Sequence, residues 1–145
     1  MVEKPILFST DMVKAILEGR KTQTRRVVKP QPLNQVIRIW TDTQDPPRYH
    51  FQAPANDYFG EETISIPKYM RGDTLYVRET YFKNAPGGLT KYFYKADEQP
   101  EEVIGQMGAF GYKWHPSIHM PREAARLFLK VKDVRVERLR DISES

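Results

Sequence analysis

The chain of 145 residues carries 29% charged, 39% hydrophobic and 12% aromatic side chains and a formal net charge of +4. This length and composition predict about one soluble globular domain and exclude a largely disordered chain. No apolar run approaches the roughly 20 residues of a transmembrane helix, and no signal-peptide pattern opens the sequence, so we expect a cytoplasmic protein without a membrane partner. Because cysteine is absent, disulfides, thiolate catalysis and thiolate metal sites are excluded.

The positive charge is concentrated in the N-terminal part of the chain. Residues 1–40 hold eight lysines and arginines against three acidic side chains, a net charge of +5 that leaves −1 for the remainder. Such a local positive field attracts phosphates and other anions, although it says nothing about the fold.

The first elements in chain order are a short apolar strand and a helix within residues 6–19, ILFSTDMVKAILEG. Ser9 or Thr10 can cap the helix N-terminus, and Gly19 can end the helix in a left-handed conformation. Apolar side chains at three- and four-residue spacing predict the buried stripe of this helix. They are Met12, Val13, Ile16 and Leu17.

An irregular, proline-rich region follows at about residues 30–60. It contains two strand-like pieces, QVIRIWT at 35–41 and RYHFQAP at 48–54. The density of prolines indicates an elaborated insertion rather than a second core.

The clearest strand pattern is RGDTLYVRETYF at residues 71–82, which has a turn at Gly72-Asp73 and a period of two. Its expected partner is KYFYKAD at residues 91–97, joined by a loop that contains Pro86, Gly87 and Gly88. A glycine-rich stretch and a last strand-like segment, Leu127 to Val136, complete the chain. We therefore expect an α+β fold with one or two helices on a small, mostly antiparallel barrel or rolled sheet.

The candidate chemistry lies in the stretch GRKTQTRR, residues 19–26, which follows the predicted helix. Guanidinium groups and a lysine suit a phosphate or a carboxylate, and threonine hydroxyls can orient a polar ligand. Two other interpretations stand beside this one: an ordinary solvated charged surface, or a lysine that takes the proton of a threonine nucleophile.

The histidines predict no metal site. His115 and His119 are separated by Pro116, which opposes a regular helix carrying both, so His119 is expected to make a structural hydrogen bond. His50 lies in the proline-rich region without an evident partner.

Arg78 and Glu79 occupy opposite faces of the predicted strand. A buried ion needs a partner, so Glu79 is either a member of an internal salt bridge, which we favour, or a carboxylate in a cleft. Seven aromatic side chains could stack on bases, although strand aromatics more often form core contacts. They are Trp40, Tyr69, Tyr76, Tyr81, Tyr92, Tyr94 and Trp114.

Three blocks in this order resemble the ASCH domain, in the form found in phage and prophage proteins. They are KPILFSTDMVKAILEGRKTQTRR, RGDTLYVRETY and HPSIHMPREAARLFLKVKDVRVERLRDIS. The resemblance spans nearly the whole chain. It implies a fold similar to the PUA domain, a small β-barrel with flanking helices, in a superfamily associated with RNA and modified-base binding.

Small bacterial ASCH proteins include an amidohydrolase that acts on N4-acetylcytidine. Its G-R-K-T-x-T motif corresponds here to residues 19–24, and the resemblance implies that Lys21 and Thr24 are catalytic. The third catalytic residue of that enzyme is a glutamate in a helix after the last strand. We expect this helix to lie beyond Ser145, so the catalytic carboxylate is not identifiable in this chain.

The sequence thus favours a single ASCH domain over residues 1–145 that binds RNA or a nucleotide-like ligand, such as a modified nucleoside, in a basic cleft. The expected ligand-binding residues are Arg20, Lys21, Thr22, Arg25, Arg26, Arg78 and Glu79. An amidohydrolase acting on an acylated nucleoside and a phage-encoded protein-interaction domain are the alternatives. No cofactor or metal is expected, and the oligomeric state stays open.

Overall fold

The computed structural model describes residues 2–31, 36, 38–53, 62–84 and 88–139. Its contacts divide the chain into two compact units, which we describe separately. Unit 1 comprises Met1–Thr24 and Asp73–Lys130, and unit 2 comprises Arg25–Gly72 and Val131–Ser145. A single domain over the whole chain stays a prediction.

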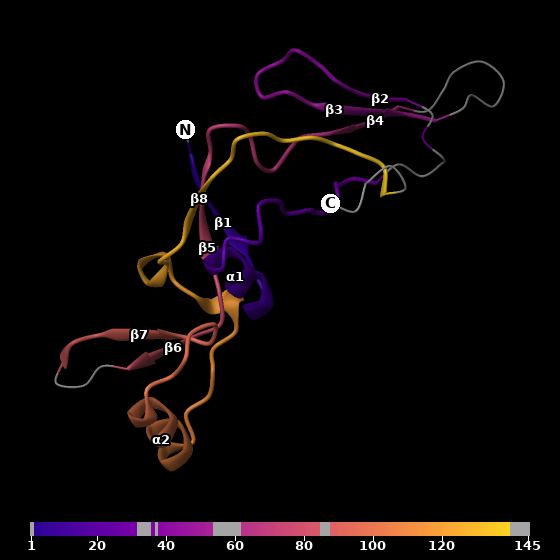
Figure 1. Ribbon diagram of the computed structural model, residues 1–145. Helices are drawn as coiled ribbons and strands as arrows, with labels where there is room; N and C mark the ends of the chain where they lie inside the picture. Colours follow the sequence, from indigo (N-terminus) through magenta and orange to yellow (C-terminus); the bar gives the residue numbers. More distant parts are fainter. Residues whose placement is uncertain (1, 32–35, 37, 54–61, 85–87, 140–145) are drawn as a thin grey trace. The chain divides into compact units, whose positions relative to one another are not determined.

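A mixed three-stranded sheet forms the centre of unit 1. Strands β1 (Glu3–Leu7), β5 (Thr74–Arg78) and β8 (Phe128–Lys130) lie in the order β1-β5-β8 (Figure 1). The β1–β5 pair is parallel, with Ile6 opposite Val77, and the β5–β8 pair is antiparallel. Buried and half-buried side chains alternate along β5, which confirms the predicted period of two.

Helix α1 (Thr10–Leu17) follows β1 as the sequence predicts. The Ser9 side chain caps it by accepting a hydrogen bond at 3.3 Å from a backbone N–H three residues later, and Gly19 follows the helix with a φ of 74°. The buried stripe is narrower than expected: Val13 is fully buried, but Leu17 is 49% exposed. Because Leu17 is the last residue of a two-turn helix, its side chain extends past the core.

A hairpin of strands β6 (Tyr81–Asn84) and β7 (Lys91–Tyr94) is the second sheet of unit 1. The predicted pairing is therefore correct for the second half of the segment 71–82. It is wrong for the first half, because β5 pairs with β1 and β8 instead. The proline and first glycine of the predicted loop fall at 85–87, outside the described residues.

Unit 1 also contains a second helix, α2 (Glu101–Phe110), which ends at Gly111 in the left-handed conformation, with a φ of 67°. Two glycines inside α2 lower its intrinsic helix propensity, so the sequence indicated a glycine-rich stretch here and not a helix. Two short 3-10 helices, η2 (Ser117–His119) and η3 (Arg122–Ala124), then precede β8.

Unit 2 contains a three-stranded antiparallel sheet. Its strands β2 (Arg38–Thr41), β3 (Tyr49–Gln52) and β4 (Glu62–Ser65) lie in the order β2-β3-β4 (Figure 1). Strands β2 and β3 fall within the two strand-like pieces of the sequence, as predicted.

The proline-rich region contributes buried side chains of its own to unit 2. Tyr49, Phe51 and Ala53 are buried on or next to β3, and Ser65 of β4 is buried and donates to the Lys29 carbonyl at 2.6 Å. The sequence predicts an insertion rather than a second core here, and the structure buries these side chains of the region. His50, between Tyr49 and Phe51, is buried as well, so side chains on both faces of β3 are buried.

The segment Leu127–Val136 does not form one long strand. Only β8 is regular, and residues 131–138 have no regular secondary structure, although the Val131 carbonyl accepts a hydrogen bond from the Gly72 N–H at 2.9 Å. The described strands form three small sheets, and with the helices they make a mixed α+β fold. None of the described helices has the length and apolar character that crossing a membrane requires.

Candidate functional site

The basic strip, residues Arg20–Arg26, directly follows α1. The backbone N–H groups of Arg20 and Lys21 both donate to the Ala15 carbonyl, at 2.8 and 3.1 Å, so the strip begins tied to the end of the helix. Residues 20–28 have no regular secondary structure, and the side chains at 22–27 are exposed. The strip therefore presents its cations to solvent.

Lys21 is the one member of the strip whose side chain is partly buried. Its Nζ donates to the Gln23 carbonyl at 2.7 Å and lies 5.5 Å from the ring centre of Phe8. Phe8 is 2% exposed, so the lysine amine rests at the edge of the unit 1 core. A cation over an aromatic face is held by the ring quadrupole, which restricts where the amine can lie.

Arg20 forms an exposed ion pair within the same turn of chain. Its Nε lies 2.5 Å from Glu18 Oε2, and more than half of each side chain is exposed. Exposed pairs of this kind contribute about 0–1 kcal/mol, so an anionic ligand can compete with Glu18 for the guanidinium.

The remaining strip residues are exposed and belong to both units. Thr22 and Thr24 close the first segment of unit 1, and Arg25 and Arg26 open unit 2. Arg26 Nη1 donates to the Arg25 carbonyl at 2.9 Å. The candidate catalytic residues, Lys21 and Thr24, thus lie on the same segment of unit 1.

Arg78 binds backbone carbonyls. Its Nε donates to the Met120 carbonyl at 3.0 Å, and its Nη2 donates to the Ile118 carbonyl. The guanidinium therefore fastens the segment around η2 to the end of β5.

Glu79 forms an internal salt bridge, the interpretation favoured from the sequence. Its side chain is 1% exposed, and both carboxylate oxygens accept from Arg126, at 2.9 and 3.1 Å. Arg126 also binds both oxygens of Asp97, at 2.8 and 2.9 Å, and lies 4.1 Å over the ring of Tyr94. Burial opposes the guanidinium charge, but the hydrogen bonds to Glu79 and Asp97 outweigh it and raise the pKa of Arg126.

His50, for which the sequence showed no evident partner, has two. Its two ring nitrogens lie 2.6 Å from Glu62 Oε1 and 2.8 Å from Asp42 Oδ2. Hydrogen bonds to Asp42 and Glu62 raise the pKa of His50 above its ordinary value. Sequence reasoning missed this cluster because its members come together only through the register of the β2–β3–β4 sheet.

The other two histidines lie beside Tyr81. His115 exchanges two backbone hydrogen bonds with Tyr81, at 2.8 and 3.2 Å, and the Tyr81 hydroxyl donates to the His119 carbonyl at 3.1 Å. The structural hydrogen bond expected of His119 is thus made by its backbone carbonyl. Within the described part of the chain, no group of three or more histidine, aspartate and glutamate side chains is arranged to hold a metal ion.

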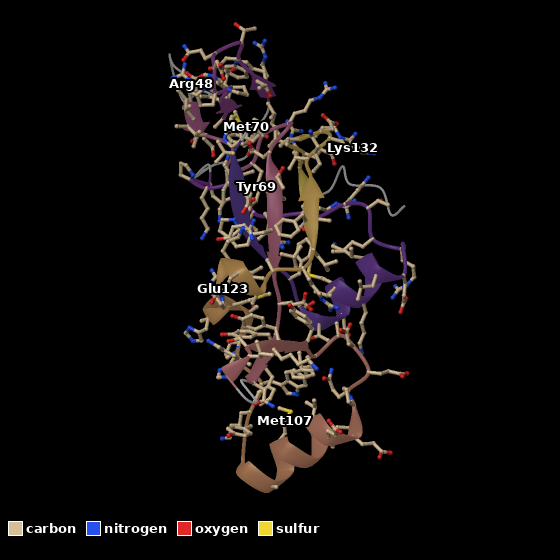
Figure 2. All side chains as sticks on the ribbon, turned by 90° about the vertical axis from the view of Figure 1, so that its left-hand side faces the viewer. Arg48, Tyr69, Met70, Met107, Glu123 and Lys132 are labelled. Atoms are coloured by element: carbon tan, nitrogen blue, oxygen red, sulfur yellow. The ribbon has the colours of Figure 1, made fainter. Side chains whose placement is uncertain are left out.

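Most of the described aromatic candidates make contacts within the protein. Tyr81 packs in a buried cluster with Met120 and Ala124, and the Tyr94 hydroxyl donates to the Ala124 carbonyl at 2.6 Å. The Tyr92 hydroxyl donates at 3.0 Å to Glu123, which Figure 2 labels on η3. These rings stabilise the fold and are not free to stack on a base.

A cavity of about 140 Å³ lies in unit 2. It is lined by Thr41, Pro47, Tyr49, Pro67, Tyr69, Met70, Arg71, Asp133 and Val134, and Figure 2 labels two of these side chains, Tyr69 and Met70. Burial and the neighbouring Asp133 raise the pKa of Tyr49. Tyr69, one of the aromatic candidates, lines this cavity, but none of the expected catalytic or ligand-binding residues of the basic strip does, so the strip is a separate feature.

No family model matches the chain, and neither a curated protein nor a solved structure is significantly similar to it. The functional interpretation therefore depends on the chemistry of the strip and on the sequence blocks that surround it.

Proposed function

We propose that this chain is an ASCH-type module with a PUA-like β-barrel, and that it binds RNA or a nucleotide-like ligand through the basic strip. The observation that carries the proposal is the concentration of Arg20, Lys21, Arg25 and Arg26 on an exposed, irregular segment. The strip lies within the first of the three blocks that resemble the ASCH domain.

The strip offers two kinds of cationic group. The guanidinium groups of Arg25 and Arg26 are exposed and can pair with phosphate oxygens in a bidentate manner. Lys21 offers a point charge whose position is restricted by Phe8 and by the Gln23 carbonyl. In this proposal the arginines supply affinity for phosphates, and Lys21 orients the ligand, with the Thr22 hydroxyl as a further polar contact.

Arg78 and Glu79 take a positioning role in the proposal. Each is bound by groups of the protein, Arg78 by the carbonyls of Ile118 and Met120 and Glu79 by Arg126. In the proposal they hold the framework of unit 1, whereas the sequence analysis expected them to bind the ligand directly.

The first test is the salt dependence of binding to a single-stranded RNA oligonucleotide, measured by fluorescence anisotropy. Each phosphate contact contributes about 0.7 to the slope of log K against log salt concentration, because a bound counterion is released. We expect Arg25→Ala combined with Arg26→Ala to weaken binding and to reduce that slope by about 1.4 if each arginine binds one phosphate.

Lys132→Ala combined with Arg135→Ala is the matched control, because both are exposed cations of unit 2 outside the strip. The control is expected to leave the slope nearly unchanged. If both double substitutions reduced the slope equally, RNA binding would depend on the overall positive charge of the protein and not on the strip. No detectable binding of the oligonucleotide at low salt concentration would favour a protein-interaction domain.

A second candidate function is an amidohydrolase acting on N4-acetylcytidine. The position of Lys21 favours it, because its amine is held at the edge of the core, three residues before a threonine. In this mechanism Thr24 Oγ attacks the acetyl carbonyl, and Lys21 accepts the hydroxyl proton after its ammonium group, which lies as a cation over the Phe8 ring, has given up a proton of its own to solvent. The acetyl group passes to Thr24, the cytidine amine leaves with that proton, and water then releases acetate.

The amidohydrolase predicts turnover of N4-acetylcytidine that is followed by the change in ultraviolet absorbance on loss of the acetyl group. Lys21→Ala and Thr24→Ala are expected to lower kcat by at least about 100-fold, the range of general base catalysis. Lys14→Ala and Thr43→Ala, exposed residues of the same types, are the matched controls. Undiminished turnover in either strip variant would remove that residue from the mechanism.

A further inference from the structure

His50, in the central strand of the β2–β3–β4 sheet, has a carboxylate at each ring nitrogen. Glu62 Oε1 lies 2.6 Å from Nδ1, and Asp42 Oδ2 lies 2.8 Å from Nε2. A neutral imidazole carries one N–H and can donate to only one of them, so its other nitrogen would face a carboxylate as a second acceptor. Two hydrogen bonds to two carboxylates therefore require the imidazolium form.

The cluster connects all parts of this sheet. Asp42 lies just after β2, His50 in β3, and Glu62 is the first residue of β4. Each of the three strands is only four residues long, so the sheet has few ladder hydrogen bonds of its own. The loss of one cross-strand cluster is consequently a large change for a sheet of this size.

The His50 ring is surrounded by charged and aromatic side chains from each described element that packs against it. From the loop after β2 come Asp42 and Arg48, whose Nε donates to Asp42 Oδ2 at 2.9 Å, and from β4 comes Glu62. From β2, Trp40 stacks on His50 with ring centres 4.9 Å apart and planes at 12°, and Arg38 lies 4.8 Å over that indole. Figure 2 labels Arg48 beside the ribbon of this sheet.

The charge balance of the cluster depends on the state of His50. Asp42 and Glu62 contribute two negative charges, and Arg48 and the imidazolium contribute two positive charges. Loss of the proton leaves one negative charge in excess and places a lone pair of the ring against a carboxylate. The side chains of His50 and Asp42 are 10% and 18% exposed, so water does little to relieve this conflict between them, whereas the Glu62 side chain is 44% exposed.

We propose that His50 is a pH-sensitive clamp of unit 2, which joins β2, β3 and β4 while the imidazole is protonated and loosens them when it loses the proton. This inference is independent of the proposed function of the strip. Opening of the clamp releases the Trp40 ring from His50 and weakens the edge strands β2 and β4.

The sign of the effect follows from the direction of the pKa shift. The folded-state pKa of His50 is raised above its ordinary value of about 6.5, so the stabilising contribution is complete below that pH and is lost as pH rises through the folded-state pKa. The pKa of Asp42 is lowered, chiefly by the hydrogen bond to His50, so its contribution is lost only in strong acid. Unit 2 is therefore expected to loosen on the alkaline side.

The test uses the full chain and follows the three histidine rings by NMR from pH 5 to pH 9. We expect the pKa of His50 to lie above 6.5 and amide protection of β2, β3 and β4, corrected for intrinsic exchange, to fall through the same pH range. Glu62→Gln removes one carboxylate and supplies an amide that can pair with a neutral ring. It is expected to move both the His50 titration and the loss of protection to lower pH.

His50→Gln is expected to abolish the pH dependence of protection in this sheet, whereas His115→Gln, at an exposed histidine of unit 1, is expected to preserve it. The proposal is overturned if wild-type His50 titrates at or below 6.5. It is also overturned if the loss of protection keeps the same midpoint in Glu62→Gln. The wild-type titration decides the question even if His50→Gln does not fold.

Discussion

Replacement of Arg126 by alanine is expected to lower the free energy of unfolding of unit 1 by about 3–5 kcal/mol. The reason is the state in which it leaves Glu79, whose side chain is 1% exposed and whose two oxygens both accept from this guanidinium. A carboxylate at that depth cannot recover its hydration, so the variant contains an uncompensated buried charge. Urea denaturation followed by circular dichroism measures the loss.

The position of Arg126 adds to the effect. Glu79 directly follows β5, Asp97 lies after β7, and Arg126 itself lies two residues before β8, so one guanidinium joins three segments that are distant in sequence. Arg126→Lys retains the charge but not the planar fork that binds two carboxylates at once. We therefore expect the lysine variant to be intermediate between alanine and the wild type.

Two comparisons isolate the buried charge as the cause. Arg20→Ala removes an arginine from an exposed pair with Glu18 and is expected to change stability by less than about 1 kcal/mol. Arg126→Ala combined with Glu79→Gln removes the unpaired charge and is expected to be more stable than Arg126→Ala alone. If Arg126→Ala costs no more than Arg20→Ala, Glu79 does not depend on Arg126.

Local signals in the sequence predicted α1 and β5 correctly, because each is specified by residues close together in the chain. Ser9 and Gly19 mark the two ends of α1, and the alternation around Leu75 and Val77 marks β5. The same sequence did not indicate that β5 pairs in parallel with β1. That pairing joins residues about 70 positions apart, and nothing in either strand specifies the partner.

The features that the sequence did not predict have physical causes of the same kind. Helix α2 contains Gly105 and Gly108, whose low helix propensity obscures the helix in the sequence. Within the segment Leu127–Val136, only the residues that pair with β5 form a strand. The partners of His50 lie 8 and 12 residues away and meet it only across the strands. For the basic strip, sequence correctly indicated charge, but the contact of Lys21 with the buried Phe8 ring needed the tertiary structure.

Phe8→Ala is the second substitution with a large expected effect, a loss of about 3–5 kcal/mol in the free energy of unfolding of unit 1. Phe8 is 2% exposed, and its backbone N–H donates to the Arg78 carbonyl at 3.0 Å, so the ring is fixed where β1 meets the end of β5. Truncation removes buried apolar surface and leaves a cavity that the rigid strand ends cannot close. Thermal and urea denaturation of the two proteins measure the loss.

The same ring lies under the amine of Lys21, so it connects the stability of the core with the proposed function of the strip. Phe8→Leu retains most of the buried volume but not the aromatic face, and it is expected to fold with a smaller loss of stability than Phe8→Ala. Phe128→Ala, which truncates a ring that is 46% exposed, is the matched control for stability. If Phe8→Leu folds and its RNA binding, or its turnover of N4-acetylcytidine, weakens as in Lys21→Ala, the ring holds the lysine in its working position. Full function in Phe8→Leu would show that Lys21 acts without this contact.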